Sequence, residues 1–499
     1  MGKVELRPYQ VDVIDRLRST AAKYKRPLLV APTGAGKTVI ASAVVASAVD
    51  KGSRVLFLAH RRELIQQAGA KLWSYGIDPG VILSGHSGRP EAQVQVASVQ
   101  TLWARAFRSN AIDLPPADLI VLDEAHHVRS RTYRKILEAY PDAVVLGLTA
   151  TPCRGDGRGL GNVFDAMVEC PSVADLVKLG FLVPTKVYAP STPDLAGVQT
   201  QRGDYVEKQL AERVDTPQLV GDIPDHWHRL AEGRQTVVFA TGVEHSVHIR
   251  DAFRASGVWA EHIDGSTPVE ERERILRQLG EGKVQVVTNC AVLTEGWDQP
   301  SVSCLILARP TRNMGLFRQM AGRVLRPAPG KDHALILDHA GAVFQHGFPE
   351  DPVRWTLAAD KRAESAQQGA GGYGNERRLT TCPECHAVRM AGRPCTACGW
   401  RPRPRGAAVD VADGELAHVD QDGTAKAPEY DQASFYRQLL GIAEEKGYRR
   451  GWASHKFKEK FGKWPPFRYT RAEVPSPAVR SWVRSRQIAY AKAMEKARV

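Results

Sequence analysis

A glycine-rich stretch near the start of the chain has the residue types that bind phosphate. The sequence APTGAGKT, residues 31–38, joins an apolar run to a stretch typical of a helix. Backbone amides of such a turn, aided by the amino end of the helix, can surround phosphate oxygens, while Lys37 adds positive charge and Thr38 offers a ligand for Mg²⁺. Ala31 stands where the usual pattern begins with glycine. The predicted phosphate-binding residues are Thr33, Gly34, Ala35, Gly36, Lys37 and Thr38.

Two adjacent carboxylates follow another apolar run, in DLIVLDEAHH. Ligands of α/β sheets bind at the carboxyl ends of the strands, where Asp123 and Glu124 are expected to lie. Asp123 can hold Mg²⁺ together with Thr38, and Glu124 can polarise an attacking water as a general base. A solvated acidic loop is the alternative. Beside a phosphate loop, the pair favours hydrolysis of ATP.

Two arginines far along the chain are candidates for stabilising negative charge on the γ-phosphate. Arg323 and Arg326, in QMAGRVLRP, are three residues apart and share a face if the segment is helical. They can act as arginine fingers, although arginines at this spacing also occur on ordinary helix surfaces. If they do act so, a second domain must close over ATP bound to the first.

Four cysteines form a cluster with the spacing C-x₂-C-x₉-C-x₂-C: Cys382, Cys385, Cys395 and Cys398. Two close pairs of thiolates can hold Zn²⁺ in a closed tetrahedral site, which predicts a small zinc ribbon with a short hairpin in the nine-residue loop. Two redox-active pairs are the alternative, but neither pair has a βαβ context.

The elements that must position these residues can be read from eight short apolar runs: PLLVAP, RVLFLAH, DLIVLDE, AVVLGLTA, TVVFATG, VQVVTN, CLILARP and HALILD. Runs that are apolar on both faces suit strands of a parallel sheet covered by helices. The stretch from Pro184 to Pro217 has weak periodicity and divides the runs four and four. We therefore expect two α/β domains, 1–183 and 184–350.

The rest of the chain reads as smaller parts. We expect a linker at 351–378, the zinc ribbon at 379–402, a second linker at 403–430 and a basic helical module at 431–499. That module has 16 Lys and Arg against 6 Asp and Glu. Its aromatic residues Trp452, Phe457, Phe461 and Trp464 are expected to pack in a core while the charges contact phosphates. Stacking of some rings on bases, or a basic tail without a ligand, are the alternatives.

Length and composition limit the class of protein. At 499 residues the chain exceeds the size of one typical domain. No run of about 18 uncharged apolar residues predicts a membrane span, and the first residues lack a signal-peptide core. We expect a monomeric cytoplasmic protein with no membrane partner.

The motifs together resemble those of superfamily 2 helicases. In order and spacing, from Leu6 to Pro327, the similar segments are LRPYQ, APTGAGKT, FLAHRRELIQQ, ASVQTL, DEAH, LTATP, VVFATG, HIDGSTP, VVTNCAVLTEGWDQP and QMAGRVLRP. The residues of these motifs are most similar to those of the branch with XPB-type helicases, the helicase arm of type III restriction enzymes and phage recombination helicases. This resemblance implies two tandem RecA-like domains and movement driven by ATP.

The resemblance also implies roles for individual residues. Adenine would contact Arg7 and Gln10. The γ-phosphate would face Gln319, Arg323 and Arg326. The residues that couple hydrolysis to movement would be His126, Thr149, Thr151, Glu295, Gly296 and Asp298. The residues along the nucleic-acid backbone would be His60, Arg61, Arg62, Gln100, Thr101 and Thr294.

These observations predict an ATP-dependent helicase or translocase with ATP, Mg²⁺ and Zn²⁺ as cofactors. We expect DNA rather than RNA as its partner, and a phage or bacterial role in replication, recombination or repair beside other proteins of those processes. Three alternatives stay open, because DEAH occurs in both RNA and DNA motors: an RNA helicase, the motor of a restriction system, or an ATP-switched nucleic-acid-binding protein.

Overall fold

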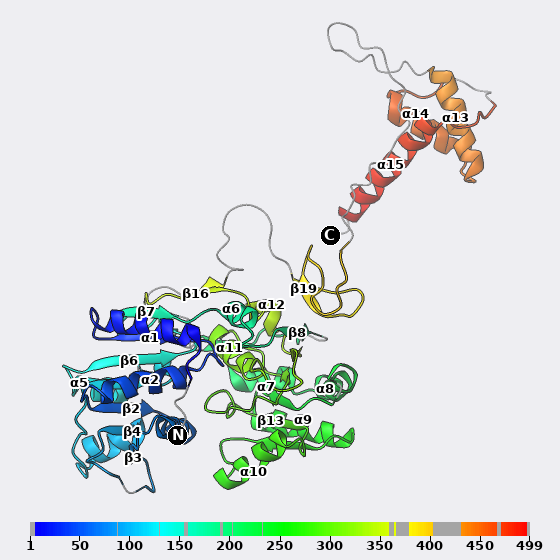
Figure 1. Cartoon of the computed structure of the whole chain (residues 1–499). Helices are drawn as coiled ribbons and strands as arrows, with labels where there is room; N and C mark the ends of the chain where they lie inside the picture. Colours follow the sequence, from blue (N-terminus) through cyan, green and yellow to red (C-terminus); the bar gives the residue numbers. More distant parts are fainter. Residues whose placement is uncertain are drawn as a thin grey trace. The chain divides into compact units, whose positions relative to one another are not determined.

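The structure is a computed structural model that describes residues 5–86, 88–128, 130–153, 158–189, 193–201, 203–231, 233–358, 364–365, 379–402, 431–466 and 471–496. The chain divides into two compact units, Met1–Arg403 and Pro404–Val499. The larger unit contains two parallel sheets and the four cysteines. The smaller unit is helical in its described part (Figure 1).

The first sheet has seven strands, all parallel, in the order β3-β4-β2-β5-β6-β1-β7. The strands are β1 (Pro27–Val30), β2 (Val55–Ala59), β3 (Gly80–Ile82), β4 (Val94–Ser98), β5 (Leu119–Leu122), β6 (Val144–Thr149) and β7 (Ala166–Glu169). The helical segments are α1 (Pro8–Ala21), α2 (Lys37–Val49), α3 (Arg62–Ser74), α4 (Val99–Leu102) with a π-helical turn (Trp103–Arg108), a 3₁₀ turn (Ala125–His127), α5 (Arg131–Glu138) and α6 (Val173–Lys178). Every residue of β1, β2 and β5 is buried, as expected for strands covered on both faces.

The second sheet has six parallel strands in the order β12-β13-β11-β14-β15-β8. The strands are β8 (Thr185–Tyr188), β11 (Thr236–Phe239), β12 (Ala260–Ile263), β13 (Val286–Asn289), β14 (Cys304–Leu307) and β15 (Ala334–Asp338). The helices are α7 (Glu207–Val214), α8 (Pro217–Leu230), α9 (Val243–Ala255), α10 (Val269–Gly280), α11 (Met314–Gly322) and α12 (Ala342–His346), and a small hairpin joins β9 (Thr200–Gln201) to β10 (Asp204–Tyr205).

The predicted fold class is confirmed, and all eight apolar runs are strands, four in each sheet. Five other strands of these sheets were not predicted from the apolar runs. β3, β7 and β12 are short or carry polar residues, and β4 includes the buried Gln95, whose amide donates to the Arg89 carbonyl at 2.7 Å. β8 lies inside the stretch that reads as a break, because at a sheet edge only part of a strand must be apolar.

The predicted linker at 351–378 begins with a packed segment. Trp355 and Leu357 pack against the apolar core of the first domain, and the Gly161 amide donates to the Leu357 carbonyl at 2.6 Å. A Cβ on Gly161 would overlap that carbonyl, so the close approach requires glycine. This segment also contains β16 (Val353–Arg354), which pairs with β17 (Glu364–Ser365). The chain therefore returns from the second domain to the first before the cysteine cluster.

The cysteine segment packs on the edge of the second sheet. Its hairpin pairs β18 (Leu379–Thr381) with β19 (Val388–Met390), and Ala387 forms a bridge with Tyr188 of β8. The sequence predicted a hairpin inside the nine-residue loop. That prediction was wrong, because the turn of the hairpin is the first cysteine pair and the loop supplies only one strand.

The smaller unit consists of α13 (Gln432–Glu445), α14 (Arg450–Phe461) and α15 (Pro477–Lys496) in its described part. Phe435 and Phe457 are buried in its core, and Trp452 and Phe461 pack partly buried against it. Trp464 is 51% exposed, which corrects the prediction that it is a core residue. The Lys458 ammonium lies 4.5 Å from its ring centre. The predicted linker at 403–430 lies outside the described residues.

In the described part of the chain, no helix combines the length and apolar character needed to cross a membrane.

Candidate functional site

A cleft of about 460 Å³ lies between the two domains of the larger unit. Twelve of the residues predicted from the motifs line it: Arg7, Thr33, Gly34, Gly36, Lys37, Thr38, Asp123 and Glu124 from the first domain, and Gly296, Asp298, Arg323 and Arg326 from the second. Phe181, Gln67, Lys71 and Trp297 also line it, and the motifs gave no reason to single them out. The cleft therefore joins groups that are up to about 300 residues apart in the sequence.

The phosphate loop has the backbone that its glycines permit. Gly34 and Gly36 have φ values of +90° and +82°, in the region where side chains are strained. A Cβ on Gly36 would also lie 2.6 Å from Nε2 of Gln10. Gly36 caps α2, which begins at Lys37, so the first amides of that helix are free to bind an anion.

One edge of the loop is held by the LRPYQ segment. The Tyr9 hydroxyl donates to the Ala35 carbonyl at 2.7 Å, and the Gln10 amide approaches the same carbonyl at 3.3 Å. The Arg7 guanidinium lies 4.5 Å from the ring centre of Phe181, which is itself 5.2 Å from the Tyr9 ring. Phe181 thus adds an aromatic face to the wall where the resemblance places adenine.

Asp123 and Glu124 follow β5 and are both buried. The Glu124 amide donates to Oδ1 of Asp123 at 3.0 Å, and Lys37 Nζ lies 3.5 Å from Oε1 of Glu124. Burial, with the charge of Glu124 beside it, raises the pKa of Asp123 to about 6. A buried carboxylate pair with one lysine has excess negative charge, and a divalent cation would offset it.

Glu295 of the second domain lies among three histidines of the first. Its Oε2 is 3.0 Å from Nε2 of His60, and its Oε1 is 3.3 Å from Nε2 of His126 and 3.4 Å from Nε2 of His127. Burial alone would raise the pKa of Glu295, but the hydrogen bonds from these rings outweigh it and lower that pKa. Glu295 therefore connects the two domains as a carboxylate.

His126 lies between Glu295 and Glu124. Its Nδ1 is 3.4 Å from both Oε2 of Glu124 and Oγ1 of Thr149. Burial would lower the pKa of His126, but Glu295 and Glu124 raise it overall. The Thr149 hydroxyl donates to the Thr151 carbonyl at 2.9 Å, so the TAT segment is joined to the same chain of contacts.

The two predicted arginines face the cleft, but not because they share a helix. α11 ends at Gly322, and Arg326 lies beyond it, before Pro327. The Arg323 guanidinium donates to the Trp297 and Thr294 carbonyls, both at 2.6 Å, and Arg326 pairs with Asp298 at 2.7 Å. Burial lowers the pKa of Arg323 to about 10. Each side chain is held by acceptors of its own domain.

Gln319 and the predicted nucleic-acid residues have varied positions. Gln319 is buried on α11 and is not among the residues that line the described cleft. Arg61 donates to the Val292 carbonyl of the second domain at 2.8 Å, and Arg62 to the Ser84 carbonyl at 3.0 Å. The remaining three differ in exposure: Gln100 is exposed, Thr101 is half-buried in the first turn of α4, and Thr294 is buried.

Two further contacts cross between the domains, and neither was expected from the motifs. Arg272 of α10 pairs with Glu63 of α3 at 2.7 Å. The Gln67 amide donates to the Gly296 carbonyl at 2.7 Å. With Arg61 and Glu295, these contacts hold the two domains together around the cleft.

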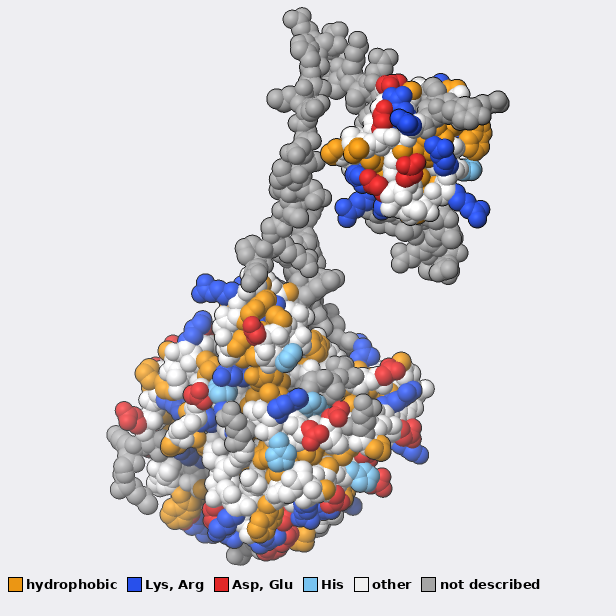
Figure 2. Space-filling model, turned by 90° about the vertical axis from the view of Figure 1, so that its right-hand side faces the viewer, with side chains coloured by type: hydrophobic (Ala, Val, Ile, Leu, Met, Phe, Trp, Pro, Cys, Tyr) orange, Lys and Arg blue, Asp and Glu red, His pale blue; other side chains and the backbone are white. Residues whose placement is uncertain are grey.

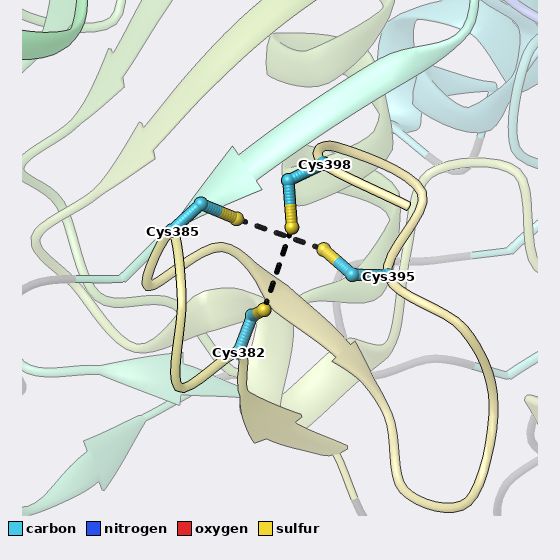
Figure 3. Close-up of side chains that lie close together, drawn as sticks. All are labelled: Cys382, Cys385, Cys395 and Cys398. Carbon is cyan, nitrogen blue, oxygen red and sulfur yellow. Dashed lines mark hydrogen bonds between the residues drawn. The ribbon is translucent and has the colours of Figure 1, made fainter. Parts of the chain in front are cut away.

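The four cysteines converge on one point (Figure 3). Their sulfurs all lie within 4.8 Å of one another, and the distances from Cys382 to Cys398 and from Cys385 to Cys395 are both 3.7 Å. Tetrahedral Zn–S bonds of about 2.3 Å place sulfurs roughly 3.8 Å apart. His386 is exposed and is not part of the group. The side chains present therefore fit a zinc ion.

Comparison with known proteins assigns families to both domains. Residues 3–154 match the family "Type III restriction enzyme, res subunit", and residues 219–328 match the "Helicase conserved C-terminal domain". A 51.5 kDa protein of Lactococcus phage (isolate 7-9) is 30% identical over 373 residues, which cover 74% of this chain and 77% of that protein. The DNA 3'-5' translocase XPB2 of Sulfurisphaera tokodaii is 26% identical, over 65% of this chain and 79% of its own.

A solved structure shows the same fold. The ATP-dependent type ISP restriction-modification enzyme LlaBIII, bound to DNA, matches 67% of this chain and 27% of its own with a TM-score of 0.51 at 17% identity. Because two helicase families match in order and the phage relative aligns with both domains, the chain belongs to the superfamily 2 helicases and is an ATP hydrolase.

Proposed function

We propose that this protein is an ATP-dependent DNA helicase or translocase whose hydrolytic site is shared by its two domains. One observation carries the proposal. The cleft has Lys37, Asp123 and Glu124 on one wall and Arg323 and Arg326 on the other, so all the groups needed for phosphoryl transfer from ATP line one cavity.

Each group has a distinct role in this proposal. Thr38 and Asp123 offer the oxygen ligands that Mg²⁺ prefers, and the ion would neutralise charge on the phosphates. Lys37 moves from Glu124 to the phosphates when ATP binds. Glu124 then accepts a proton from the attacking water.

The arginines make hydrolysis depend on the second domain. Because Arg326 pairs with Asp298, and Arg323 with two carbonyls, both must exchange these partners for phosphate oxygens. Hydrolysis removes the γ-phosphate and returns them to their own domain. The cleft therefore closes and opens once per ATP, and loops that grip a strand on both domains move relative to each other.

His126 and Glu295 extend this coupling towards the strand. The contacts from Glu124 through His126 to Glu295 join the hydrolytic base to the second domain. Arg61, beside Glu295, lines a second cavity of about 370 Å³ with Arg272. Glu63, the partner of Arg272, lines the same cavity. Arg61 and Arg272 suit a phosphodiester backbone, bound without regard to sequence, once Arg272 exchanges Glu63 for a phosphate.

DNA is favoured over RNA by a relative. The translocase of Sulfurisphaera tokodaii, which matches 65% of this chain, is named as acting on DNA. The smaller unit would add further phosphate contacts. Figure 2 shows Lys and Arg side chains on its visible face, interspersed with acidic ones. In this proposal the four cysteines hold a structural Zn²⁺ that supports the edge of the second sheet.

The proposal is tested by ATP hydrolysis with single-stranded, duplex and forked DNA and with RNA. We expect DNA to stimulate ATP hydrolysis by the wild-type protein. Glu124→Gln should lower the turnover by about 100-fold or more with every substrate. Stimulation by RNA alone would overturn the choice of DNA. If neither nucleic acid stimulates hydrolysis, the motor function is wrong.

A further inference from the structure

A cluster of metal-ligating side chains lies where the two domains meet, apart from the four cysteines and the Mg²⁺ ligands. It consists of His60, after β2, His127, in the 3₁₀ turn after β5, and Glu295, after β13 of the second domain. One ligand atom from each lies within 4.8 Å of the others. The rings of His60 and His127 are 4.3 Å apart.

The separations suit a small transition-metal ion. Nitrogen and oxygen ligands at about 2.0 Å from Zn²⁺ are roughly 3.3 Å apart in a tetrahedron. Oε2 of Glu295 is 3.0 Å from Nε2 of His60, and Oε1 of Glu295 is 3.4 Å from Nε2 of His127, so each carboxylate oxygen faces one imidazole at about this separation. Two imidazoles and one carboxylate favour Zn²⁺, Co²⁺ or Ni²⁺ over Mg²⁺.

The site is open to solvent on one side. The His127 side chain is 42% exposed, whereas those of His60 and Glu295 are 16% and 7% exposed. An ion can therefore enter past His127, and water can fill its remaining coordination position. His126 also contacts Glu295, with its Nε2 3.3 Å from Oε1, and the same ring faces Glu124 and Thr149 through Nδ1. His126 therefore links this cluster to the chain of contacts that reaches Glu124.

We propose that His60, His127 and Glu295 form a binding site for a divalent transition-metal ion, which holds the two domains together and slows the ATPase cycle. Two ligands belong to the first domain and one to the second, so an ion bound to all three opposes opening of the cleft. Arg61 is the competing cation at this carboxylate, 3.5 Å from Oε2 of Glu295. The ion would replace that contact.

Metal binding can be measured directly on the full-length protein with its cysteine site loaded with zinc. Co²⁺ is titrated without nucleotide and with excess Mg²⁺, which saturates oxygen-ligand sites. We expect one additional Co²⁺ per chain, with d–d absorption and without the sulfur-to-cobalt charge-transfer band that exchange into the cysteine site would give. The absence of this additional ion would overturn the proposal.

His127→Gln should weaken Co²⁺ binding by more than about tenfold, because loss of even an outer-shell partner of a metal site costs that much. The matched control is His86→Gln, an exposed histidine of the same domain outside the cluster. Glu295→Gln, which keeps the side-chain shape, should weaken binding as well. Equal affinity in wild type and His127→Gln would contradict the site.

The inhibitory effect has its own readout. We expect micromolar Co²⁺ to slow ATP hydrolysis by the wild type and by His86→Gln, and to leave His127→Gln unaffected over the same range. If Co²⁺ binds but hydrolysis is unchanged, the role in holding the domains together is wrong. Because spectroscopic binding requires neither ATP nor DNA, its outcome is independent of the proposed motor function.

Discussion

The buried charges in the cleft between the two domains indicate which ligands the cleft should bind. Lys37 compensates only one of two adjacent carboxylates, and Asp123 has a pKa of about 6 because burial and Glu124 disfavour its charged form. A divalent cation restores the balance of charge, and the phosphates of ATP then offer Lys37 a stronger partner than Glu124. The charges that line the cleft therefore favour binding of a metal–nucleotide complex.

Another buried residue predicts how stability changes with pH. His245 of α9 is 2% exposed, and the Thr241 hydroxyl lies 2.8 Å from its Nδ1. Burial lowers the pKa of His245 to about 4, below its value of about 6.5 in the unfolded chain. This contribution to stability is complete above pH 6.5 and is lost as the pH falls towards 4.

We therefore expect His245 alone to cost about 2 kcal/mol of the free energy of unfolding between pH 7 and pH 5. The melting temperature of His245→Gln should fall less than that of the wild type over this interval. His228→Gln, at an exposed position of α8, is the matched control and should follow the wild type. Parallel falls for wild type and His245→Gln would contradict the assignment.

Some site residues could be predicted from the sequence and others could not, for a physical reason. The phosphate loop and the DEAH carboxylates are recognisable because their chemistry needs fixed residue types at short spacing. Phe181 lines the cleft through packing between distant segments, so no local pattern identifies it. Gln67 and Trp297 lie within the segments FLAHRRELIQQ and VVTNCAVLTEGWDQP, but the motifs assign their side chains no role. The contact of His127 with Glu295 also joins distant segments, so the sequence could not predict it, although His127 is the second histidine of the quoted segment DEAHH.

At the scale of elements, apolar runs predicted the central strands because both of their faces are buried. Edge strands β8 and β12 escaped the prediction because a partly exposed strand tolerates polar residues. Helical spacing predicted that Arg323 and Arg326 share a face of one helix. Both side chains instead reach the cleft because the turn after α11 directs them into it.

The cysteine hairpin supports an element of the second domain. Ala387 bridges to Tyr188 of the edge strand β8, and the Tyr188 ring packs with Cys382 and Cys395. We expect the double variant Cys382→Ser, Cys385→Ser to lose its zinc and lower the melting temperature of the full chain. Metal content and melting temperature are measured together, with Cys290→Ser, a half-buried cysteine that is not part of the cluster, as the control. Unchanged zinc content would contradict the four-cysteine site.

At the scale of the whole larger unit, closure of the cleft is stabilised by contacts outside the proposed nucleotide site. Glu63 and Arg272 pair across the domains at 2.7 Å, with side chains 37% and 16% exposed. Arg272→Glu places two carboxylates in contact. Because the ion pair contributes a coupling free energy of order 1 kcal/mol between the domains, its loss should lower DNA-stimulated turnover by about threefold to tenfold.

The reversed pair, Glu63→Arg with Arg272→Glu, should recover part of this loss. The double-mutant cycle is measured on turnover at low and high salt, because a partly exposed pair is screened by salt. Additive effects of the two substitutions would show that the pair does not couple the domains.

The central claim is that two domains share one hydrolytic site, and Arg326 tests it most directly, since it belongs to the second domain while Lys37 belongs to the first. The measurement is ATP turnover of Arg326→Ala at saturating DNA, with ATP affinity determined in parallel and Arg277→Ala, an exposed arginine of α10, as the control. We predict that turnover falls by about 1000-fold while the affinity for ATP changes little. Turnover equal to that of the wild type would contradict a shared site.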